Sequence, residues 1–324
     1  MAITLSDAVV TARDFQGLDL KEKKQLVNPW LTEQSIGLLT GWRGTGKTWA
    51  ALSIALSITS GQPFGPWECS NPAPVLYLDA EMPATDIKDR LKTLSYRDSH
   101  SSLYIYSDHF ASEIGLRRAH LKDTKWQRDM KQVLLERKIK LVILDNLASL
   151  ASGVDENSTR EWSPINAFLL GLRFDGISSM LLHHTGKGGA QRGTSAREDN
   201  LDYSIILKRP WDYLPEQGCR FVIHFSKSRV GTKDLSLLAD LEFQLKQDER
   251  GDAVWTYGDV KGHTKRAVLK ACADGVKQSD IASIVGISAG RVSQIIGQAK
   301  KEELLTMKGS LTGKGYLFAG EDEG

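Results

Sequence analysis

The chain has 324 residues, and its 42 lysine and arginine side chains nearly balance 40 aspartates and glutamates, giving a formal net charge of +2. Single cores usually stop growing near roughly 250 to 300 residues, so we expect more than one domain. Three scattered cysteines exclude a disulfide framework, and no apolar run approaches the ~20 residues of a membrane span. We therefore expect a cytoplasmic protein without a membrane contact.

The chain opens with a segment of unassigned role, residues 1–30, in which a helix at 5–13 that docks on a neighbouring subunit is plausible. Next come an apolar run at 35–40, the octet GWRGTGKT at 41–48 and a helical pattern at 49–56. This order of strand, glycine loop and helix fits the phosphate-binding pattern G-x-x-x-x-G-K-S/T. The predicted ATP-binding residues are Gly41, Arg43, Gly44, Thr45, Gly46, Lys47, Thr48 and Asp145.

The chemistry of the octet follows from its residue types. Glycines let backbone N–H groups close around phosphates, and the following helix directs its positive end at them. Lys47 would reach the β- and γ-phosphates. Thr48 and Asp145, the latter at the end of the apolar run 140–145, are the predicted Mg²⁺ residues. An apolar run ending in Asp is a weak signal alone, and gains weight from the phosphate loop ~100 residues earlier.

Beyond the loop, apolar segments of strand length alternate with helical patterns, which indicates an α/β fold with a mostly parallel twisted sheet. We expect strands at 74–79, 103–106, 140–145 and 176–183, and helices at 84–94, 125–137 and 160–173. Shorter strands at 201–207, 220–225 and 238–245 suggest an antiparallel extension. The polar stretch 251–263 is suited to joining two domains, so the predicted ATPase domain is 31–255.

The strand PVLYLD at 74–79 leads into the candidate for the catalytic carboxylate. Glu81 follows this strand, whose carboxyl end should lie beside the phosphate loop, and Met82-Pro83 turns the chain at once. A carboxylate near the γ-phosphate positions or deprotonates the attacking water. Asp79 is a competitor, and a solvated loop carboxylate is the alternative role of Glu81.

The C-terminal stretch differs in character. From 261 to 320 it has ten lysine and arginine against four acidic residues, and helices are expected at 265–273, 278–285 and 289–305. The last two of these helices, with the glycine turn between them, resemble a helix-turn-helix. Residues 309–318 are expected to form a two-stranded wing. This predicts a winged-helix domain over 262–320. Its candidates for contact with base edges of duplex DNA are Arg291, Gln294, Ser288 and Ser293, and Lys300 and Lys301 are expected nearer phosphate; a protein-contact or ring-packing role remains open.

Six motifs in one unbroken order resemble a RecA-like P-loop ATPase of the plasmid RepA type, a family of ring-forming replicative helicases. They are GWRGTGKT, VLYLDAEMP, LVILDNL, LLHHTGKGG, RGTS-x-x-x-DN and the K-x-R at 227–229. The resemblance covers about residues 30 to 250. It implies ATP and Mg²⁺ as cofactors, a homo-oligomer of hexameric type, and DNA as partner.

The resemblance also assigns roles to residues. It implies that Glu81 is the catalytic carboxylate and that His184, rather than His183, senses the γ-phosphate, unless both rings are structural. Arg90 would be structural or close to the nucleotide, or merely solvated. Lys227 and Arg229 would act in a neighbouring subunit's active site, although an exposed basic edge is the alternative. The family's further arginine after the DN pair is missing here, where the chain reads Asp199-Asn200-Leu201-Asp202.

A glycine-rich basic loop follows His184. In RecA-like rings this position faces the central channel and holds single-stranded DNA, although a solvated loop would look the same in sequence. The loop has no aromatic residue for base stacking, so binding would be led by phosphate contacts and weakened by salt. Its candidate contacts are Lys187, Arg192 and Arg197.

Together these features predict an ATP-driven DNA helicase or translocase, working as a ring in the replication of a plasmid, phage or mobile element. Two alternatives remain open. A DNA-binding, ATP-dependent regulator would use the C-terminal domain for sequence recognition without unwinding. A recombination-type ATPase would coat single strands instead.

Overall fold

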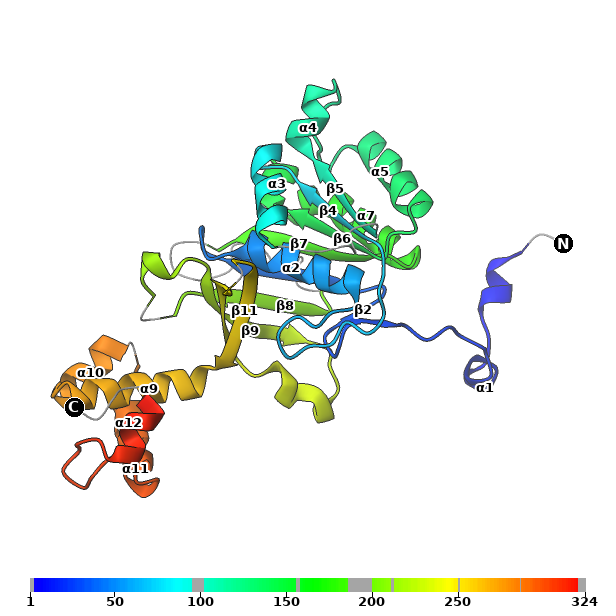
Figure 1. The fold of residues 1–324 in the computed structure, drawn as a ribbon. Coiled ribbons are helices and arrows are strands. Elements are labelled where there is room, and N and C mark those ends of the chain that lie inside the picture. The colour runs from blue at the N-terminus through cyan, green and yellow to red at the C-terminus, as the bar shows by residue number, and fades with distance from the viewer. Residues whose placement is uncertain are drawn as a thin grey trace.

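The computed structural model describes residues 3–94, 102–155, 158–185, 200–210, 213–249, 251–285 and 287–319. They form a large sheet with helices on both faces, a helical C-terminal domain and an extended N-terminal segment (Figure 1). In the part of the chain so described, every helix is too short or too polar to cross a bilayer.

The large sheet has nine strands. In chain order they are β3 (Ile36–Gly41), β4 (Val75–Asp79), β5 (Leu103–Ser107), β6 (Leu141–Asp145), β7 (Ser178–His184), β8 (Tyr203–Lys208), β9 (Arg220–Ser228), β10 (Leu241–Gln247) and β11 (Ala253–Asp259). The associated helices are α2 (Lys47–Ser60), α3 (Ala84–Thr93), α4 (Asp108–Glu113), α5 (Thr124–Glu136), α6 (Leu147–Leu150) and α7 (Thr159–Phe174), with 3₁₀ turns at Pro215–Gln217 and Thr232–Leu238.

The strand order is β11-β10-β9-β8-β3-β7-β6-β4-β5. The six strands from β8 to β5 run parallel, and β9, β10 and β11 continue the sheet in antiparallel pairs. This confirms the predicted α/β fold with a mostly parallel twisted sheet. One detail of the sequence interpretation is wrong: β8 belongs to the parallel part, because it pairs in parallel with β3.

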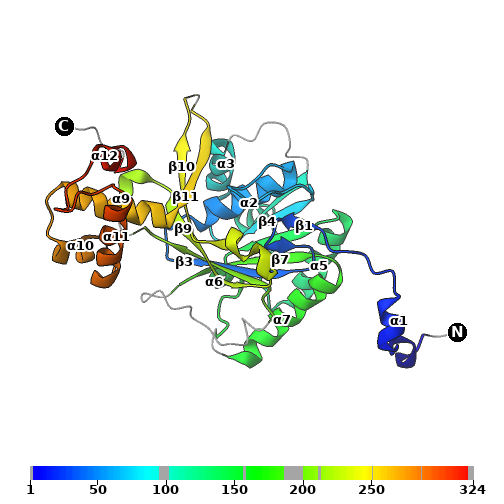
Figure 2. The same cartoon turned by 90° about the horizontal axis from the view of Figure 1, so that it is seen from below.

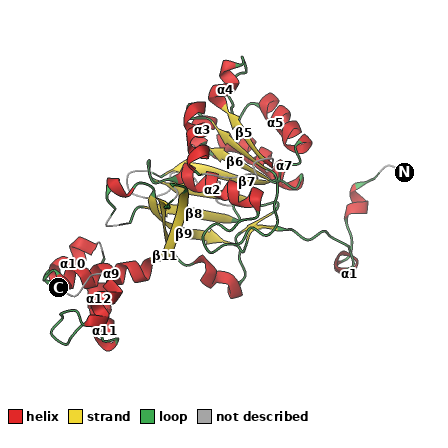
Figure 3. Ribbon diagram, in the orientation of Figure 1, coloured by secondary structure: helices red, strands yellow, loops and turns green. Residues whose placement is uncertain are grey.

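Alternating side chains of the strands divide the interior into two cores, one on each face of the sheet. On one face, Leu39 and the apolar residues of α2 join the large aromatic residues of β9 to β11. On the other face, Ile36 and Leu38 pack with α5 and α7. The layering of helices on both faces is visible in Figures 1 and 3. Because both faces are covered, the central strands are buried along their whole length, as a parallel sheet requires.

The segment 251–263, interpreted from sequence as a polar linker, instead forms β11 and the first turn of the following helix. Trp255 of β11 donates its Nε1–H to Ser53 Oγ of α2 at 2.8 Å and packs against Phe243 and Phe221. The linker interpretation failed because every residue of β11 is at least partly exposed, so the strand does not have the sequence of a buried apolar run.

The C-terminal domain contains α9 (Val260–Ala273), α10 (Gln278–Val285), α11 (Ala289–Lys301) and α12 (Gly313–Ala319), and has its own small cores. The predicted helix at 278–285 has the bounds of α10, whereas the third helix ends at 301, before Glu303 adopts a φ of 61°. The wing expected at 309–318 is also corrected. Leu305 and Leu311 form a single antiparallel bridge, and the chain then enters α12.

Two short elements replace the single helix expected at 5–13: a 3₁₀ turn, η1 (Leu5–Ala8), and α1 (Ala12–Gln16). Thr11 separates them, because its side chain caps α1 by accepting the Asp14 N–H at 3.2 Å. Neither element buries a residue, and the segment extends away from the sheet in both views (Figures 1 and 2). A small hairpin of β1 (Gln25–Val27) and β2 (Leu31–Thr32) connects it to β3.

A substitution at Phe243 tests whether β9 to β11 are part of the ATPase core. Its fully buried ring stacks on Phe64 with centroids 5.1 Å apart. Phe243→Ala should lower the free energy of unfolding by about 3 to 5 kcal/mol, measured by urea unfolding followed by tryptophan fluorescence. Phe174→Ala is the matched control, because Phe174 is 86% exposed and should contribute little. Equal effects of the two variants would contradict the assignment.

Candidate nucleotide-binding and active site

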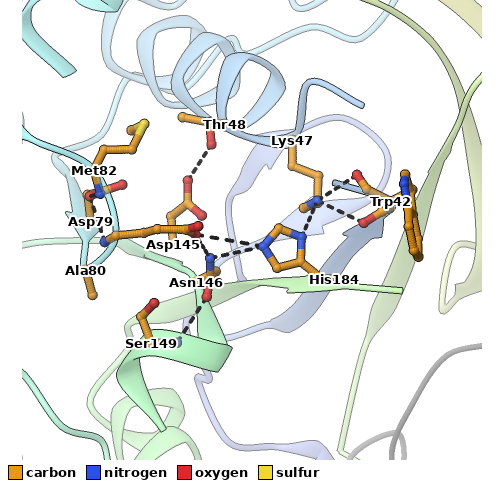
Figure 4. Close-up of polar contacts among 12 residues, drawn as sticks. Trp42, Lys47, Thr48, Asp79, Ala80, Met82, Asp145, Asn146, Ser149 and His184 are labelled. Atoms are coloured by element: carbon orange, nitrogen blue, oxygen red, sulfur yellow. Dashed lines mark hydrogen bonds and ion pairs between the residues drawn. The ribbon is translucent and has the colours of Figure 1, made fainter. Parts of the chain in front are cut away.

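The candidate site lies where the carboxyl ends of four neighbouring strands meet the N-terminus of α2. In register, Gly41 of β3 is opposite His184 of β7, and Asp79 of β4 is opposite Asp145 of β6. These strands are consecutive in the sheet. Side chains at their ends are therefore held side by side by the backbone ladder (Figure 4).

The glycine loop is shaped to bring backbone atoms to a ligand. Gly44 and Gly46 have φ of 73° and 98°, a region that favours glycine. A Cβ at Gly46 would lie 2.4 Å from Cys219 Sγ, so a larger residue does not fit. Gly46 is also the N-cap of α2. A cradle of N–H groups at a helix N-terminus fits a phosphate chain.

Lys47 is buried at the centre of the site, with 5% of its surface exposed. Its Nζ donates to the carbonyl oxygens of Gly41 at 2.8 Å and Trp42 at 3.1 Å, and contacts His184 Nδ1 at 2.9 Å. Burial lowers the pKa of Lys47 to about 8, although the nearby Asp145 and Glu81 carboxylates oppose this shift. An ammonium with so little solvation is a strong partner for phosphate oxygens.

Thr48 and Asp145, the predicted Mg²⁺ residues, are hydrogen-bonded to each other. Thr48 Oγ1 donates to Asp145 Oδ2 at 2.8 Å, and Tyr77 OH donates to the same oxygen at 2.5 Å. Burial raises the pKa of Asp145, and the Glu81 carboxylate adds to that effect, while these two hydrogen bonds oppose it. A hydroxyl and a buried carboxylate together fit a hard, oxygen-preferring divalent cation that keeps most of its water.

Asp79 holds the turn that presents Glu81. Its Oδ1 accepts the backbone N–H groups of Glu81 at 3.0 Å and Met82 at 2.7 Å, and the residue is only 1% exposed. Burial raises the pKa of Asp79 to about 7. Glu81 itself has a side chain that is 55% exposed. This geometry assigns the two competing carboxylates different places, with Asp79 supporting the turn and Glu81 facing the site.

Asn146 is a residue that the sequence analysis missed. Its Oδ1 accepts the Ser149 N–H at 3.1 Å and caps α6, which fixes the orientation of the side-chain amide. The amide Nδ2 therefore faces the other way, donates to Glu81 Oε2 and lies 3.3 Å from His184 Nε2. The available signal was the N-cap pattern after the strand, since Asn is among the preferred capping residues.

His184 connects Lys47 to Glu81. Since a protonated lysine offers only donors, His184 Nδ1 accepts from Lys47 at 2.9 Å, and the other ring nitrogen, Nε2, lies 3.8 Å from Glu81 Oε2. Burial lowers the pKa of His184, and the charges of Lys47 and Arg43 lower it further, while the Glu81 and Asp145 carboxylates oppose this shift. His183, the other candidate, is buried within β7 at 4% exposure.

Lys227 and Arg229 lie at the opposite end of the sheet from the loop. Lys227 pairs with Ser204 near the start of β8, and Arg229 forms an ion pair with Asp202 at 3.3 Å. Asp202 in turn accepts the backbone N–H of Ile36, where β3 begins. The phosphate loop follows the other end of β3. The two ends of this six-residue strand are about 17 Å apart, at ~3.3 Å per strand residue.

The remaining residues singled out from the sequence are the candidate DNA contacts and Arg90. Lys187, Arg192 and Arg197 lie outside the described residues. On α11, Arg291 and Gln294 are exposed and hydrogen-bonded to each other at 3.2 Å. Arg90 lies over the Trp49 ring, 5.3 Å from its centroid, and so contacts the helix that follows the loop.

Among the described residues, no group of three histidine, cysteine or acidic side chains is arranged to hold a metal ion by itself. A Mg²⁺ ion at Thr48 and Asp145 would therefore depend on ligands from phosphate and water as well.

Comparison with known proteins finds two matching family models and, among other solved structures, one described here. A family model described as "AAA domain" matches residues 3–190, more than half of the chain. A second model, described as "wHTH-PRTase associated", matches residues 266–319. Among solved structures, a KaiC-like protein from the hyperthermophilic archaeon Pyrococcus horikoshii OT3 is 18% identical, with a TM-score of 0.48 over 71% of this chain and 94% of that chain.

Asp79→Asn should remove a pH dependence of stability. The variant keeps an oxygen for the Glu81 and Met82 N–H groups. In the wild-type protein, burial holds the pKa of Asp79 at about 7, above its value in the unfolded chain. The folded state therefore binds the proton more tightly, and the free energy of unfolding falls as pH rises from about 4 to 7, by at most ~1.4 kcal/mol per pH unit from this group.

Urea unfolding at intervals between pH 4 and 8 measures this difference. Asp89→Asn is the control, because the Asp89 side chain is 70% exposed and keeps most of its contact with water when the chain folds. We expect the pH profile of Asp89→Asn to follow the wild type, whereas that of Asp79→Asn is flatter. A profile of Asp79→Asn that parallels the wild type would contradict the assignment.

Proposed function

The chain belongs to the AAA domain family, and on this premise we propose that it is a Mg²⁺-dependent ATP hydrolase that acts on DNA as an oligomer, as a helicase or translocase. Family membership supports ATP-driven activity. The finer proposal rests on the site geometry, on the resemblance to the plasmid RepA type, and on the C-terminal match to a winged helix-turn-helix family.

One observation favours an oligomer above all others. Lys227 and Arg229 lie at the end of the sheet where β3 begins, whereas Lys47 lies at the end where β3 leads into the loop. A side chain of ~7 Å does not span a gap of about 17 Å. If these two cations neutralise charge on the γ-phosphoryl group, they do so in the site of a second copy.

Within one chain, the residues supply the parts that hydrolysis needs. Glu81 orients a water molecule and accepts its proton as the water oxygen bonds to the γ-phosphorus and the bond to the β-phosphate oxygen breaks. Asn146 holds the Glu81 carboxylate through its amide N–H. Lys47 neutralises the phosphate oxygens. When bound at Thr48 and Asp145, Mg²⁺ would stabilise the negative charge on the β- and γ-phosphates.

His184 supports a link between phosphate occupancy and DNA binding. It contacts Lys47 through one ring nitrogen and faces Glu81 with the other, and β7 ends at this residue. A phosphate group that draws Lys47 away from His184 would change the hydrogen bonding at the end of β7. The basic loop with Lys187, Arg192 and Arg197 follows within a few residues, so it would receive this change first.

A DNA-binding, ATP-dependent regulator is the second candidate. The observation that favours it is α11, where Ser288 caps the helix and Arg291 and Gln294 are exposed at its N-terminal end. Val292 and Ile295 bury the other face, so the exposed side chains are free of a core role. This arrangement supports a role of α11 in reading the major groove.

Mixing two inactive variants tests the shared site. Glu81→Gln should lower ATP turnover at least ~100-fold, and Arg229→Ala on the order of 10³-fold. In a 1:1 mixture, about one interface in four joins an intact Glu81 to an intact Arg229, if copies exchange at random. We therefore expect turnover to return to a substantial fraction of the wild-type value.

Lys246→Ala is the control for Arg229→Ala, because Lys246 is an exposed cation on the neighbouring strand β10. It should leave turnover unchanged. A mixture as inactive as its components would contradict the shared site, as would an Arg229→Ala variant with wild-type turnover.

DNA dependence separates the two candidate functions. ATP turnover is measured without DNA, with single-stranded DNA and with duplex, followed by a strand-displacement assay. Stimulation by single strands with displacement supports the motor. Sequence-selective duplex binding without stimulation supports the regulator, and then Arg291→Ala should cost about 1 to 3 kcal/mol of binding free energy at the cognate site. Lys246→Ala again serves as control.

A further inference from the structure

The turn that presents Glu81 is held from more than one side. Asp79 accepts the Glu81 N–H, and the Ala80 N–H donates to the backbone carbonyl oxygen of Asp145 at 2.8 Å. A third contact comes from outside the nucleotide site. Arg118 Nη2 donates to the Ala80 carbonyl oxygen at 3.3 Å. An arginine that is distant in sequence therefore holds the peptide group directly before Glu81.

Arg118 lies in the loop after α4 and is itself held by Asp108. Its Nε donates to Asp108 Oδ2 at 2.9 Å, and the Asp108 side chain is only 4% exposed. The other oxygen, Oδ1, accepts the Ala119 N–H at 2.7 Å. A carboxylate bonded through both oxygens has a fixed orientation. Because the guanidinium is planar, fixing its Nε also directs its terminal N–H groups.

The register of the sheet explains why these residues meet. Ser107, the last residue of β5, is opposite Asp79, the last residue of β4. Asp108 and Ala80 are the next residues of the two chains, so they leave the same edge of the sheet as neighbours. Adjacent strands are only about 4.8 Å apart. The outermost strand, β5, thus supports the site although it lies furthest from the phosphate loop among the parallel strands.

A small cavity lies beside the turn, with a volume of about 250 Å³. Glu81 and Arg118 both line it. Arg118 also lines a larger groove between β5 and α5, and its side chain is 71% exposed. An ion pair with so exposed an arginine contributes little to the stability of the fold. Its effect is therefore expected at the turn that it contacts and not in the free energy of unfolding.

We propose that Arg118, oriented by Asp108, is a positioning residue for Glu81 and acts through the Ala80 carbonyl group. The inference rests on the proposed role of Glu81 in ATP hydrolysis. The Glu81 side chain is 55% exposed, so its place relative to an attacking water depends on this turn and on Asn146. A displacement of about 1 Å at a catalytic group can cost about 100-fold in rate.

Arg118→Ala tests this role, with Arg117→Ala as the matched control. Both arginines are exposed and line the β5–α5 groove, but of the two only Arg118 lines the cavity beside Glu81. Arg118→Ala should lower kcat for ATP about 10- to 100-fold. It should leave KM unchanged, because the phosphate loop is intact. Arg117→Ala should keep both constants at the wild-type values.

A double variant separates positioning from an independent effect. In the Glu81→Gln background, no carboxylate remains to be positioned. Adding Arg118→Ala there should lower the residual turnover by less than about two-fold. A further loss as large as in the wild-type background would overturn the proposal, because Arg118 would then act without Glu81.

Hydrogen exchange tests the contact without ATP. The N–H groups of Ala80, Glu81 and Met82 are hydrogen-bonded, and they should exchange faster in Arg118→Ala but not in Arg117→Ala. Unchanged exchange in Arg118→Ala would overturn the proposal even where turnover falls. A wild type without ATP turnover would instead sink the proposed function, and the exchange rates would still decide whether Arg118 holds the turn.

Discussion

The site depends on one constraint: the ammonium of Lys47 and the carboxylates of Asp79 and Asp145 are all buried at the same edge of a parallel sheet. Burial lowers the pKa of Lys47 and raises those of Asp79 and Asp145, because each charge has lost much of its water. The three groups offset one another only in part. A phosphate chain supplies the negative charge that Lys47 needs, and a divalent cation the positive charge that Asp145 needs. These electrostatics fit the nucleotide and Mg²⁺ of the proposed function.

The sequence predicts the parts of this site that follow from local order. An apolar strand that ends in a carboxylate, or in a glycine loop, brings its last residue to the same edge as every parallel neighbour. That is why Lys47, Asp145 and Glu81 could be placed together without a structure. Asn146 could not, because its position near Glu81 depends on a four-residue helix that its own side chain caps. His184 could be placed at a strand end, but its contact with Lys47 required the β3–β7 register.

The antiparallel part of the sheet, β9 to β11, was harder to predict. The segment that contains β11 resembles a linker, because every residue of this strand is at least partly exposed. The place of Arg229 depends on the direction of β9, which runs back along β8 and brings the arginine to Asp202 at the far end of the sheet. Spacing within the chain gives the two-residue offset of the K-x-R motif but not this direction. The most informative distance in the molecule, from Arg229 to the loop, was therefore invisible in the sequence.

The same topology bears on how copies would be arranged. Groups that act on one phosphate but lie at opposite ends of a sheet require a neighbour placed head-to-tail, because a two-fold symmetric pair presents identical surfaces to each other.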